Sequence, residues 1–377
     1  MNELDLRAWL TLRSVDGVGS ATIWTLVQAW GSPTAVLSAS IADLRDRGCS
    51  PALADAIRRP LETVRQKQID REVKVLSRRG VSILSCLDAA YPAALRSLPD
   101  PPTLLYCMGQ WHPDDACAIA VVGSRRATPA GRAFTERLSQ ELAQAGWTVV
   151  SGLARGIDGA AHRGALAAGG RTIAVLGCGI DRTYPPEHAA LRREIEARGV
   201  VVSEFSLGAA PHSYHFPQRN RIISGLSRGV VVTEATLESG SLITARLAAD
   251  QGREVFAVPG SIRDDTSRGP HKLLRDGAKL VERAEDIILE LWPQLEESAR
   301  QRLTARAAAG GTEPAPRTQT LNSEEAEILG ALGVDPLHID VLAERTHLPA
   351  SSLAATLLTL ELRGLVRQLP GQLYLRL

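Results

Sequence analysis

Between residues 119 and 164 the chain repeats one order of elements twice: an apolar strand, a glycine-containing turn and a helix. The strands and the turns that follow them are 119–122 with 123–128, and 147–150 with 151–156. Strands joined through helices run parallel, so their carboxyl ends meet at one edge of the sheet. The pattern therefore predicts a doubly wound α/β core whose ligand edge carries these two turns.

The same alternation continues for more than a hundred residues. Further apolar runs rich in β-branched residues are expected to be strands at 172–176, 200–202, 230–233 and 254–258, with helices around 220–223 and over 241–250. Continuous apolar strands are typical of a parallel sheet covered by helices on both faces. We place this core at 112–290.

The chemistry of the turns indicates a phosphate ligand. Glycine lets the backbone approach a ligand closely, and a helix start offers unpaired N–H groups to an anion. Arg125, Arg126 and Arg155 stand beside the two turns. Neither 123–128 nor 177–182 fits G-x-G-x-x-G, and no P-loop is present, so neither a nicotinamide cofactor nor ATPase activity is indicated.

Two other motifs are discounted. The G-x-S-x-G at 225–229 follows a predicted helix and precedes a strand, the reverse of a nucleophile elbow. His212 and His215, and Asp158 with His162, lack a third metal ligand. We therefore expect no catalytic residue, metal or cofactor.

Basic residues and glycine-hydroxyl turns recur on several loops that the doubly wound fold brings to one edge. The candidate nucleic-acid-binding residues are Gly123, Ser124, Arg125, Arg126, Arg155, Arg219, Arg221, Gly240, Ser241 and Lys272. Such a groove would follow several phosphates and favour single strands without regard to sequence. Our hypothesis is that Ser124, Arg125 and the start of the following helix hold one phosphate. Arg219 and Arg221 either extend the track or pair with Glu234.

The regions before the core read as a helical domain over 1–75, followed by a bridge with strands at 81–84 and 103–106 within a domain spanning 76–295. The turn Gly17-Val18-Gly19 is either a phosphate-binding helix-hairpin-helix turn or a plain connection between helices. Residues 296–322 contain an Ala-Gly-Pro-rich run and are predicted to be a flexible linker.

The tail, 323–377, reads as three helices and a hairpin around Pro370-Gly371, which makes a winged helix-turn-helix. The tail has four arginines, which include Arg363, and seven acidic residues, which include Asp335. Its net charge is therefore −3. Since phosphate neutralisation supplies most non-specific affinity for DNA, a protein-interaction role is favoured, with an ordinary DNA-binding winged helix as the alternative.

The charge balance of the whole chain excludes bulk attraction to nucleic acid. Its 377 residues carry 43 Lys and Arg against 42 Asp and Glu, so binding must come from a local patch. Five scattered cysteines without C-x-x-C fit a reducing compartment. The start lacks a signal-peptide pattern and no run is long enough to span a membrane, so we expect a cytoplasmic protein.

These blocks resemble the DprA/Smf family, the DNA-processing proteins of bacterial natural transformation. The resemblance is carried by 121–125, 151–162, 175–181, 216–227, 239–245 and 258–260. It implies a sterile-alpha-motif-like (SAM-like) N-terminal domain, an extended Rossmann core and a winged-helix tail. It further implies a homodimer without enzymatic activity that binds and protects single-stranded DNA. This dimer would load RecA on the DNA and displace single-strand-binding protein.

Two other function classes remain as alternatives. The core is also similar to that of the cytokinin-activating phosphoribohydrolases, whose P-G-G-x-G-T-x-x-E block carries a catalytic glutamate. The corresponding region here, 238–246, lacks the second glycine pattern and the terminal acid. A winged-helix transcription factor would instead bind one duplex sequence through the tail.

Overall fold

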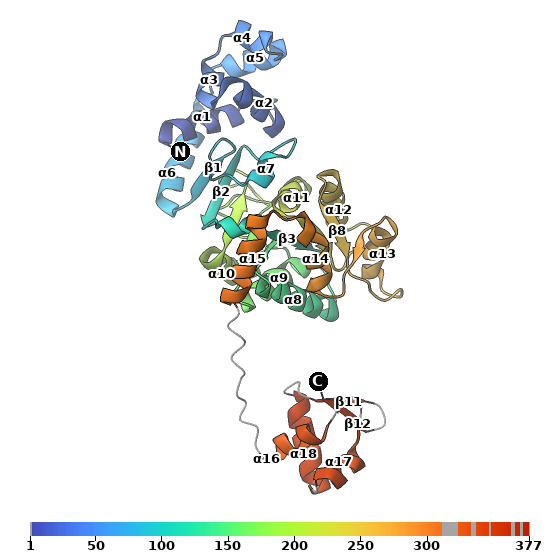
Figure 1. The fold of residues 1–377 in the computed structure, drawn as a ribbon. Helices are drawn as coiled ribbons and strands as arrows, with labels where there is room; N and C mark the ends of the chain where they lie inside the picture. The colour runs from blue at the N-terminus through green and yellow to red at the C-terminus, as the bar shows by residue number, and fades with distance from the viewer. Residues whose placement is uncertain are drawn as a thin grey trace. The chain divides into compact units, whose positions relative to one another are not determined.

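A nine-stranded sheet forms the centre of the larger of two units into which the chain divides, Met1–Gly311 and Thr312–Leu377. The computed structural model describes residues 2–310, 323–332, 337–346, 348–362, 366–369 and 372–376. Figure 1 shows the elements of each unit. Each unit is considered by itself.

The sheet has the strand order β1-β2-β6-β5-β4-β3-β7-β8-β9. All strands from β6 to β9 in this order are parallel, whereas β1 and β2 add an antiparallel edge beside β6. The strands are β1 (Ser82–Ser85), β2 (Leu104–Gly109), β3 (Ala118–Val122), β4 (Thr148–Ser151), β5 (Thr172–Val175), β6 (Val200–Ser203), β7 (Gly229–Val232), β8 (Glu254–Ala257) and β9 (Lys279–Leu280). This confirms the predicted mostly parallel α/β core.

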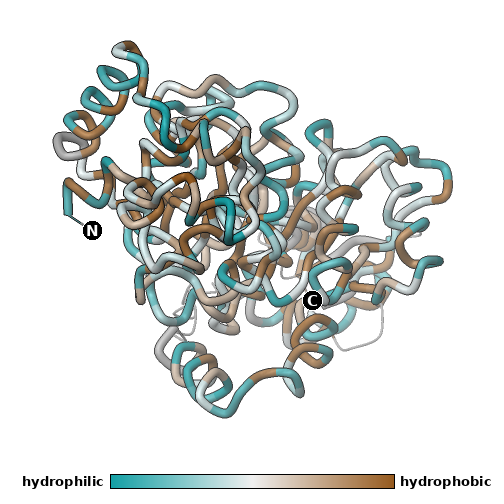
Figure 2. The backbone as a smooth tube through the Cα atoms, turned by 90° about the horizontal axis from the view of Figure 1, so that it is seen from above, coloured by the Kyte–Doolittle hydropathy of each residue, from teal (hydrophilic) through white to brown (hydrophobic). Residues whose placement is uncertain are grey.

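Helices cover both faces of the sheet. They are α7 (Ala93–Arg96), α8 (Pro129–Gln144), α9 (Ile157–Ala167), α10 (Ala189–Arg198), α11 (His215–Leu226), α12 (Gly240–Asp250), α13 (Arg268–Arg275), α14 (Ala284–Leu291) and α15 (Glu297–Gly310). Side chains alternate between the faces along each strand. In β3, Ala120 belongs to the core with α11 and α12, and Val121 to the core with α8 and α9. Figure 2 shows the hydrophobic stretches along the inner segments of the chain.

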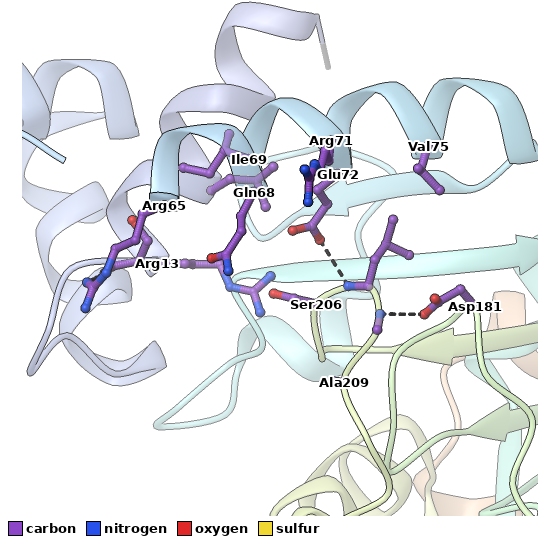
Figure 3. A pocket seen from close by; sticks show the side chains of 14 residues that line it. Arg13, Arg65, Gln68, Ile69, Arg71, Glu72, Val75, Asp181, Ser206 and Ala209 are labelled. Atoms are coloured by element: carbon purple, nitrogen blue, oxygen red, sulfur yellow. Dashed lines mark hydrogen bonds between the residues drawn. The ribbon is translucent and has the colours of Figure 1, made fainter. Parts of the chain in front are cut away.

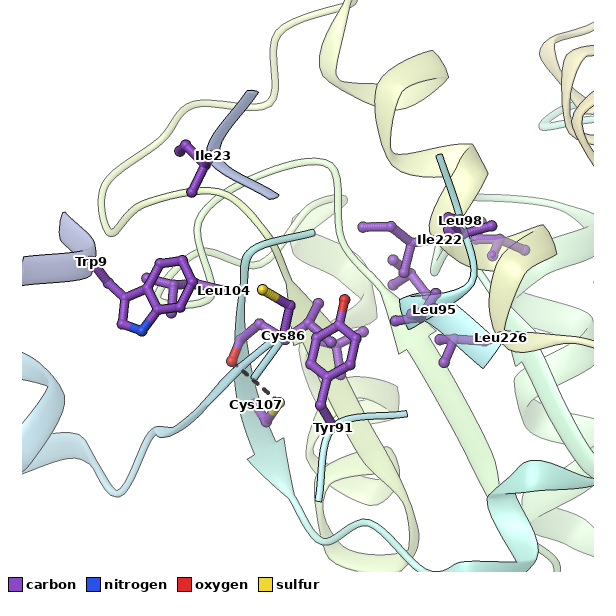
Figure 4. Packing of buried hydrophobic residues seen from close by; sticks show 14 of the residues in the cluster. Trp9, Ile23, Cys86, Tyr91, Leu95, Leu98, Leu104, Cys107, Ile222 and Leu226 are labelled. Carbon is purple, nitrogen blue, oxygen red and sulfur yellow. Dashed lines mark hydrogen bonds between the residues drawn. The ribbon is translucent and has the colours of Figure 1, made fainter. Parts of the chain in front are cut away.

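The N-terminal helices share the first of these cores. They are α1 (Glu3–Arg13), α2 (Ser20–Trp30), α3 (Pro33–Ser38), α4 (Ile41–Asp46), α5 (Pro51–Arg58) and α6 (Thr63–Arg79). Trp9 of α1 belongs to the same buried cluster as Cys86 and Leu104 at the antiparallel edge (Figure 4). The helical domain therefore packs on the sheet through continuous apolar contact.

The glycine turn between α1 and α2 carries an acid beside it. Gly17 has φ +82, a left-handed conformation that glycine adopts without strain. The carboxylate of Asp16 is 85% exposed and pairs with Arg65 at 2.9 Å. The turn therefore lies beside an ion pair whose charges balance, and both interpretations of Gly17-Val18-Gly19 stay predictions.

Part of the predicted linker is a packed helix. Residues 297–310 form α15, whose Ala299 and Leu303 are 2% exposed within the core that contains α8 and α14. The Ala-rich composition read as flexible is also a good helix former, and burial of these two side chains selects the helix. The rest of the predicted linker, 311–322, lies outside the described residues.

The smaller unit has the predicted winged-helix elements. They are α16 (Ser323–Ala331), β10 (Leu337–His338), α17 (Ile339–Thr346), α18 (Ala350–Leu362), β11 (Val366–Leu369) and β12 (Leu373–Arg376). The prediction missed β10, which pairs with β12 to make a three-stranded sheet. Leucines of α16, α17 and α18 form its core. Pro370-Gly371, Arg363 and Asp335 lie outside the described residues.

No helix among the described residues is long and apolar enough to cross a membrane. Within the same part of the chain, no group of three or more His, Cys, Asp and Glu side chains is placed to hold a metal ion.

His162 makes the stability of the larger unit sensitive to acid. It is fully buried in α9, its Nδ1 lies 2.7 Å from Thr172 Oγ1, and burial lowers its pKa from 6.5 to about 3. Between these values the unfolded chain binds a proton that the folded chain does not. Stability is therefore full above pH 6.5 and falls as the pH drops toward 3.

The unfolding free energy of the wild type should fall between pH 7 and pH 5, in part because His162 must stay unprotonated in the folded chain. We expect this fall to be about 2 kcal/mol smaller in His162→Gln. Urea unfolding followed by tryptophan fluorescence measures this in the larger unit, which contains all six tryptophans. His271→Gln, at a half-buried histidine of α13, is the matched control. An equal loss in wild type and His162→Gln would contradict the prediction.

Candidate nucleic-acid interface

A large cavity lies at the carboxyl ends of β3 and β7, where the strand order of the sheet reverses. From β3 the chain moves to β4 on one side, whereas from β7 it moves to β8 on the other. The helices that follow these two neighbouring strands therefore leave in opposite directions and open a crevice at their carboxyl ends. A cavity of about 830 Å³, here called the central pocket, occupies this position.

The central pocket brings together loops that are far apart in the sequence. From the predicted site it includes Gly123, Ser124, Arg125, Arg126, Arg219, Gly240 and Ser241. Further lining residues include Ala154, Asp158, Tyr184, Phe216, Asn220 and Ser239. The predicted convergence on one edge thus holds for seven of the candidates, which are joined there by residues of α11.

Glu234, directly after β7, holds the loop that follows β3. Its backbone oxygen accepts a 2.6 Å hydrogen bond from the Ser124 N–H. Its carboxylate accepts hydrogen bonds from both the N–H and the hydroxyl of Thr128, the N-cap residue of α8. A carboxylate of this chain thus lies at the start of α8, which argues against the hypothesis that this helix end binds a phosphate.

The N-terminus of α12 lines the central pocket, as does the first turn of α11. Ser239 is its N-cap, Gly240 and Ser241 begin the helix, and no acidic residue lies in the first turn. Asn220 of α11 donates to the Gly240 oxygen at 3.3 Å and so fixes this end against α11. Since the helix dipole favours negative charge here, this end of the pocket suits an anion.

Arg125 faces the same pocket and has an aromatic partner. Its guanidinium carbon lies 4.7 Å from the ring centroid of Phe216, and the ring of Tyr184 lies 5.7 Å from that of Phe216. Arg125 is exposed and makes no ion pair with any described residue. The sequence analysis missed this aromatic pair. Aromatic residues make up 4% of the chain, so an aromatic residue at the polar start of a helix could have indicated a binding site.

Arg219 is buried beneath the pocket rather than free on its surface. It is 3% exposed, and its guanidinium donates to the backbone oxygens of Gly152 and Val175. Burial lowers its pKa to about 10. Gly152 is required here, because a Cβ at this position would overlap the Arg219 guanidinium. Arg219 therefore links the ends of β4 and β5 while it adds positive charge to the pocket floor.

Asp158 is an acid that lines the central pocket and interacts with the charge of Arg219. It is 6% exposed and accepts hydrogen bonds from the N–H groups of Gly152 at 3.1 Å and Ala154 at 3.3 Å. Burial raises its pKa, whereas the charge of Arg219 opposes that shift. Its carboxylate shapes the turn after β4 and is partly balanced by Arg219.

Three candidates of the predicted site do not line the central pocket. Arg221 is buried and binds Glu204 through two hydrogen bonds of 2.8 and 2.7 Å, with Asp100 at 2.8 Å. It therefore takes a structural role, with Glu204 rather than Glu234 as its partner. Arg155 pairs with Glu187 on the surface, and Lys272 is exposed on α13.

Comparison with known proteins agrees with this architecture. A family model described as DNA recombination-mediator protein A matches residues 82–292, and another, described as the DprA winged helix domain, matches 312–372. The chain belongs to the DprA/Smf family. The protein Smf of Escherichia coli K12 is 40% identical over 319 residues, which cover 83% of this chain and 82% of that protein.

Two solved structures of the family have similar folds. The DprA of Streptococcus pneumoniae has a TM-score of 0.64 and 36% identity, covering 76% of this chain and 97% of that one. The DprA of Helicobacter pylori, solved to describe its single-stranded DNA binding mode, has a TM-score of 0.52 and 33% identity, covering 57% and 97%. The fold expected from the family resemblance is thereby confirmed.

Removal of the Glu234 carboxylate should loosen the loop after β3. We expect Glu234→Ala to lower the unfolding free energy by about 1–2 kcal/mol, because Thr128 loses both carboxylate partners at the start of α8. Urea unfolding measures the change, with Glu238→Ala, an exposed acid of the same connection, as control. Equal stability of the two variants would contradict this role.

Proposed function

We propose that this protein binds single-stranded DNA across the central pocket. The observation that carries the proposal is that the free Arg125 guanidinium lies in the same crevice as the start of α12, whose first turn has no acidic residue. A guanidinium and backbone N–H groups both recognise phosphate oxygens. The DprA of Helicobacter pylori, whose solved structure describes single-stranded DNA binding, supports the same ligand for a relative of this chain.

Backbone contacts and stacking explain a preference for single strands. Arg125 and Arg126 hold phosphates, which carry no sequence information. Phe216 and Tyr184 present ring surfaces on which any unpaired base can stack, whereas the bases of a duplex are already stacked. Binding is therefore expected for any sequence and weakened by salt.

The wider role proposed is that of a recombination mediator in natural transformation. In this role a cytoplasmic homodimer protects incoming single-stranded DNA and loads RecA on it, displacing single-strand-binding protein. Membership of the DprA/Smf family supports this part of the proposal, as does the model described as DNA recombination-mediator protein A.

A hydrolase of the phosphoribohydrolase type is the weaker candidate. Among the residues that line the central pocket, Asp158 is the one with a carboxyl group that could act in catalysis. Two backbone N–H groups already donate to this carboxylate. This engagement supports a structural role over general acid or base catalysis. Incubation with nucleoside monophosphates, followed by a search for released base, separates the two candidates.

Arg125→Ala should weaken binding of single-stranded oligonucleotides of any sequence. We expect roughly a fivefold to tenfold loss and a salt dependence flatter by about one phosphate contact, because one guanidinium no longer neutralises a phosphate. Fluorescence anisotropy over a salt series with single- and double-stranded oligonucleotides measures both quantities.

Arg246→Ala is the matched control for Arg125→Ala, since Arg246 is exposed on α12 but does not line the pocket. It should leave affinity unchanged. Wild-type affinity in Arg125→Ala would remove this residue from the site, and stronger binding of one duplex sequence would favour the transcription-factor alternative.

Deletion of 323–377 should leave most of the affinity for single-stranded DNA. The reason is that the tail has a net charge of −3 and thus adds little phosphate neutralisation. The same anisotropy titration compares the truncated and full chains. A collapse of binding in the truncated chain would assign DNA contact to the winged helix.

A further inference from the structure

A second cavity lies at the same edge of the sheet, next to the N-terminal helices. It has a volume of about 710 Å³ and is here called the N-terminal cleft. One wall consists of α1 and α6, and the other consists of Ser206–Ala209, which follows β6, with Asp181 from the loop after β5. Figure 3 shows Gln68 and Glu72 projecting from α6 toward this second wall.

The cations of the N-terminal cleft are better placed for a ligand than its acids. Arg71 is exposed and has no hydrogen bond or ion pair with any described residue. The two acids are engaged: Glu72 accepts from the Leu207 N–H at 3.2 Å and the Tyr106 hydroxyl at 2.7 Å, and Asp181 accepts from the Gly208 N–H at 2.8 Å. A free guanidinium thus faces a cleft whose carboxylates are held by the protein.

A second guanidinium of the cleft is fixed in place. Arg13 donates to the Tyr106 hydroxyl at 3.2 Å and to the backbone oxygen of Glu204 at 2.7 Å. A third, Arg65, pairs with Asp16 outside the cleft. Arg71 is therefore the arginine most available to an anion.

The N-terminal cleft and the central pocket are neighbours. The connection between β6 and α11 lines the cleft with Ser206–Ala209 and the central pocket with Pro211 and Ser213. The loop after β5 likewise gives Asp181 to the cleft and Tyr184 to the pocket. Three strand spacings separate β3 from β6, or roughly 14 Å. A strand of a few nucleotides covers such a distance.

Exposed aromatic rings stand on the connection between β6 and α11, which contributes residues to both cavities. Tyr214 is 65% exposed, and its ring stacks on that of the exposed His212 with centroids 5.4 Å apart and planes within 4°. Exposed flat rings on a connection shared by two cationic sites can provide a stacking surface for unpaired bases.

We propose that the N-terminal cleft is a second subsite for single-stranded DNA, filled only by strands longer than the central pocket accommodates. The strand passes from the central pocket over His212 and Tyr214 and places a phosphate at Arg71, with Gln68 as a further donor. This inference rests on the proposed function of the central pocket, and it assigns nucleic-acid contact to the helical domain.

The test compares a short and a long oligothymidylate, of about 6 and about 20 nucleotides, by fluorescence anisotropy over a salt series. Arg71→Gln should weaken binding of the long oligonucleotide roughly fivefold and reduce its salt slope by about one, while binding of the short one stays the same. Arg71→Glu should enlarge the loss for the long strand. Arg59→Gln, at an exposed arginine of the same domain outside the cleft, should change neither.

The outcomes separate this inference from the proposed function. Equal effects of Arg71→Gln on both lengths, or no effect on either, would overturn the second subsite, as would equal wild-type affinity for both lengths. Failure of the wild type to bind either oligonucleotide, or wild-type affinity of Arg125→Ala for the short one, would instead overturn the central pocket as the primary site.

Discussion

The reversal of strand order between β3 and β7 is the constraint on which the site depends. These strands are hydrogen-bonded neighbours, yet their connections lead to opposite halves of the sheet. No helix can cover the carboxyl ends of both, so a crevice remains there. The crevice is lined by loops that follow the strands and by the starts of helices. Every residue proposed to contact DNA in the central pocket belongs to one of these loops or to a helix that starts there.

Buried charges fix the shape of this crevice. Arg219 ties together the ends of β4 and β5, Arg221 holds Glu204 after β6, and Glu234 secures the loop after β3. A buried charge is expensive unless it is paired and hydrogen-bonded. Arg221 has Glu204 as its ion-pair partner, whereas the guanidinium of Arg219 donates to two backbone oxygens. This frame leaves Arg125 free at the surface. The backbone that carries Arg125 is therefore rigidly supported, and little backbone entropy would be lost on binding a ligand, although the exposed side chain would still have to be ordered.

Much of the architecture could be predicted because its signals are local. The apolar runs at 119–122 and 230–233 and the glycines after them indicated the strands and the edge where their loops meet. The details of the site were less accessible. The start of α8 was a reasonable phosphate site until Glu234, 106 residues later, was found to cap it. Arg221 was expected to contact either DNA or Glu234, and its partner is Glu204. Each of these pairings joins segments that no periodicity relates.

The sequence by itself determined the order of strands and helices, the three-helix tail and the edge of the sheet at which the glycine-containing turns meet, because hydrophobic periodicity and turn chemistry act over a few residues. Only the tertiary structure decided which arginines are free and which are buried, and which helix start is open. It also decided that α6 closes a cleft beside the central pocket. These properties depend on contacts across the fold, where a carboxylate or a carbonyl from a distant segment takes up a charge that would otherwise face the solvent.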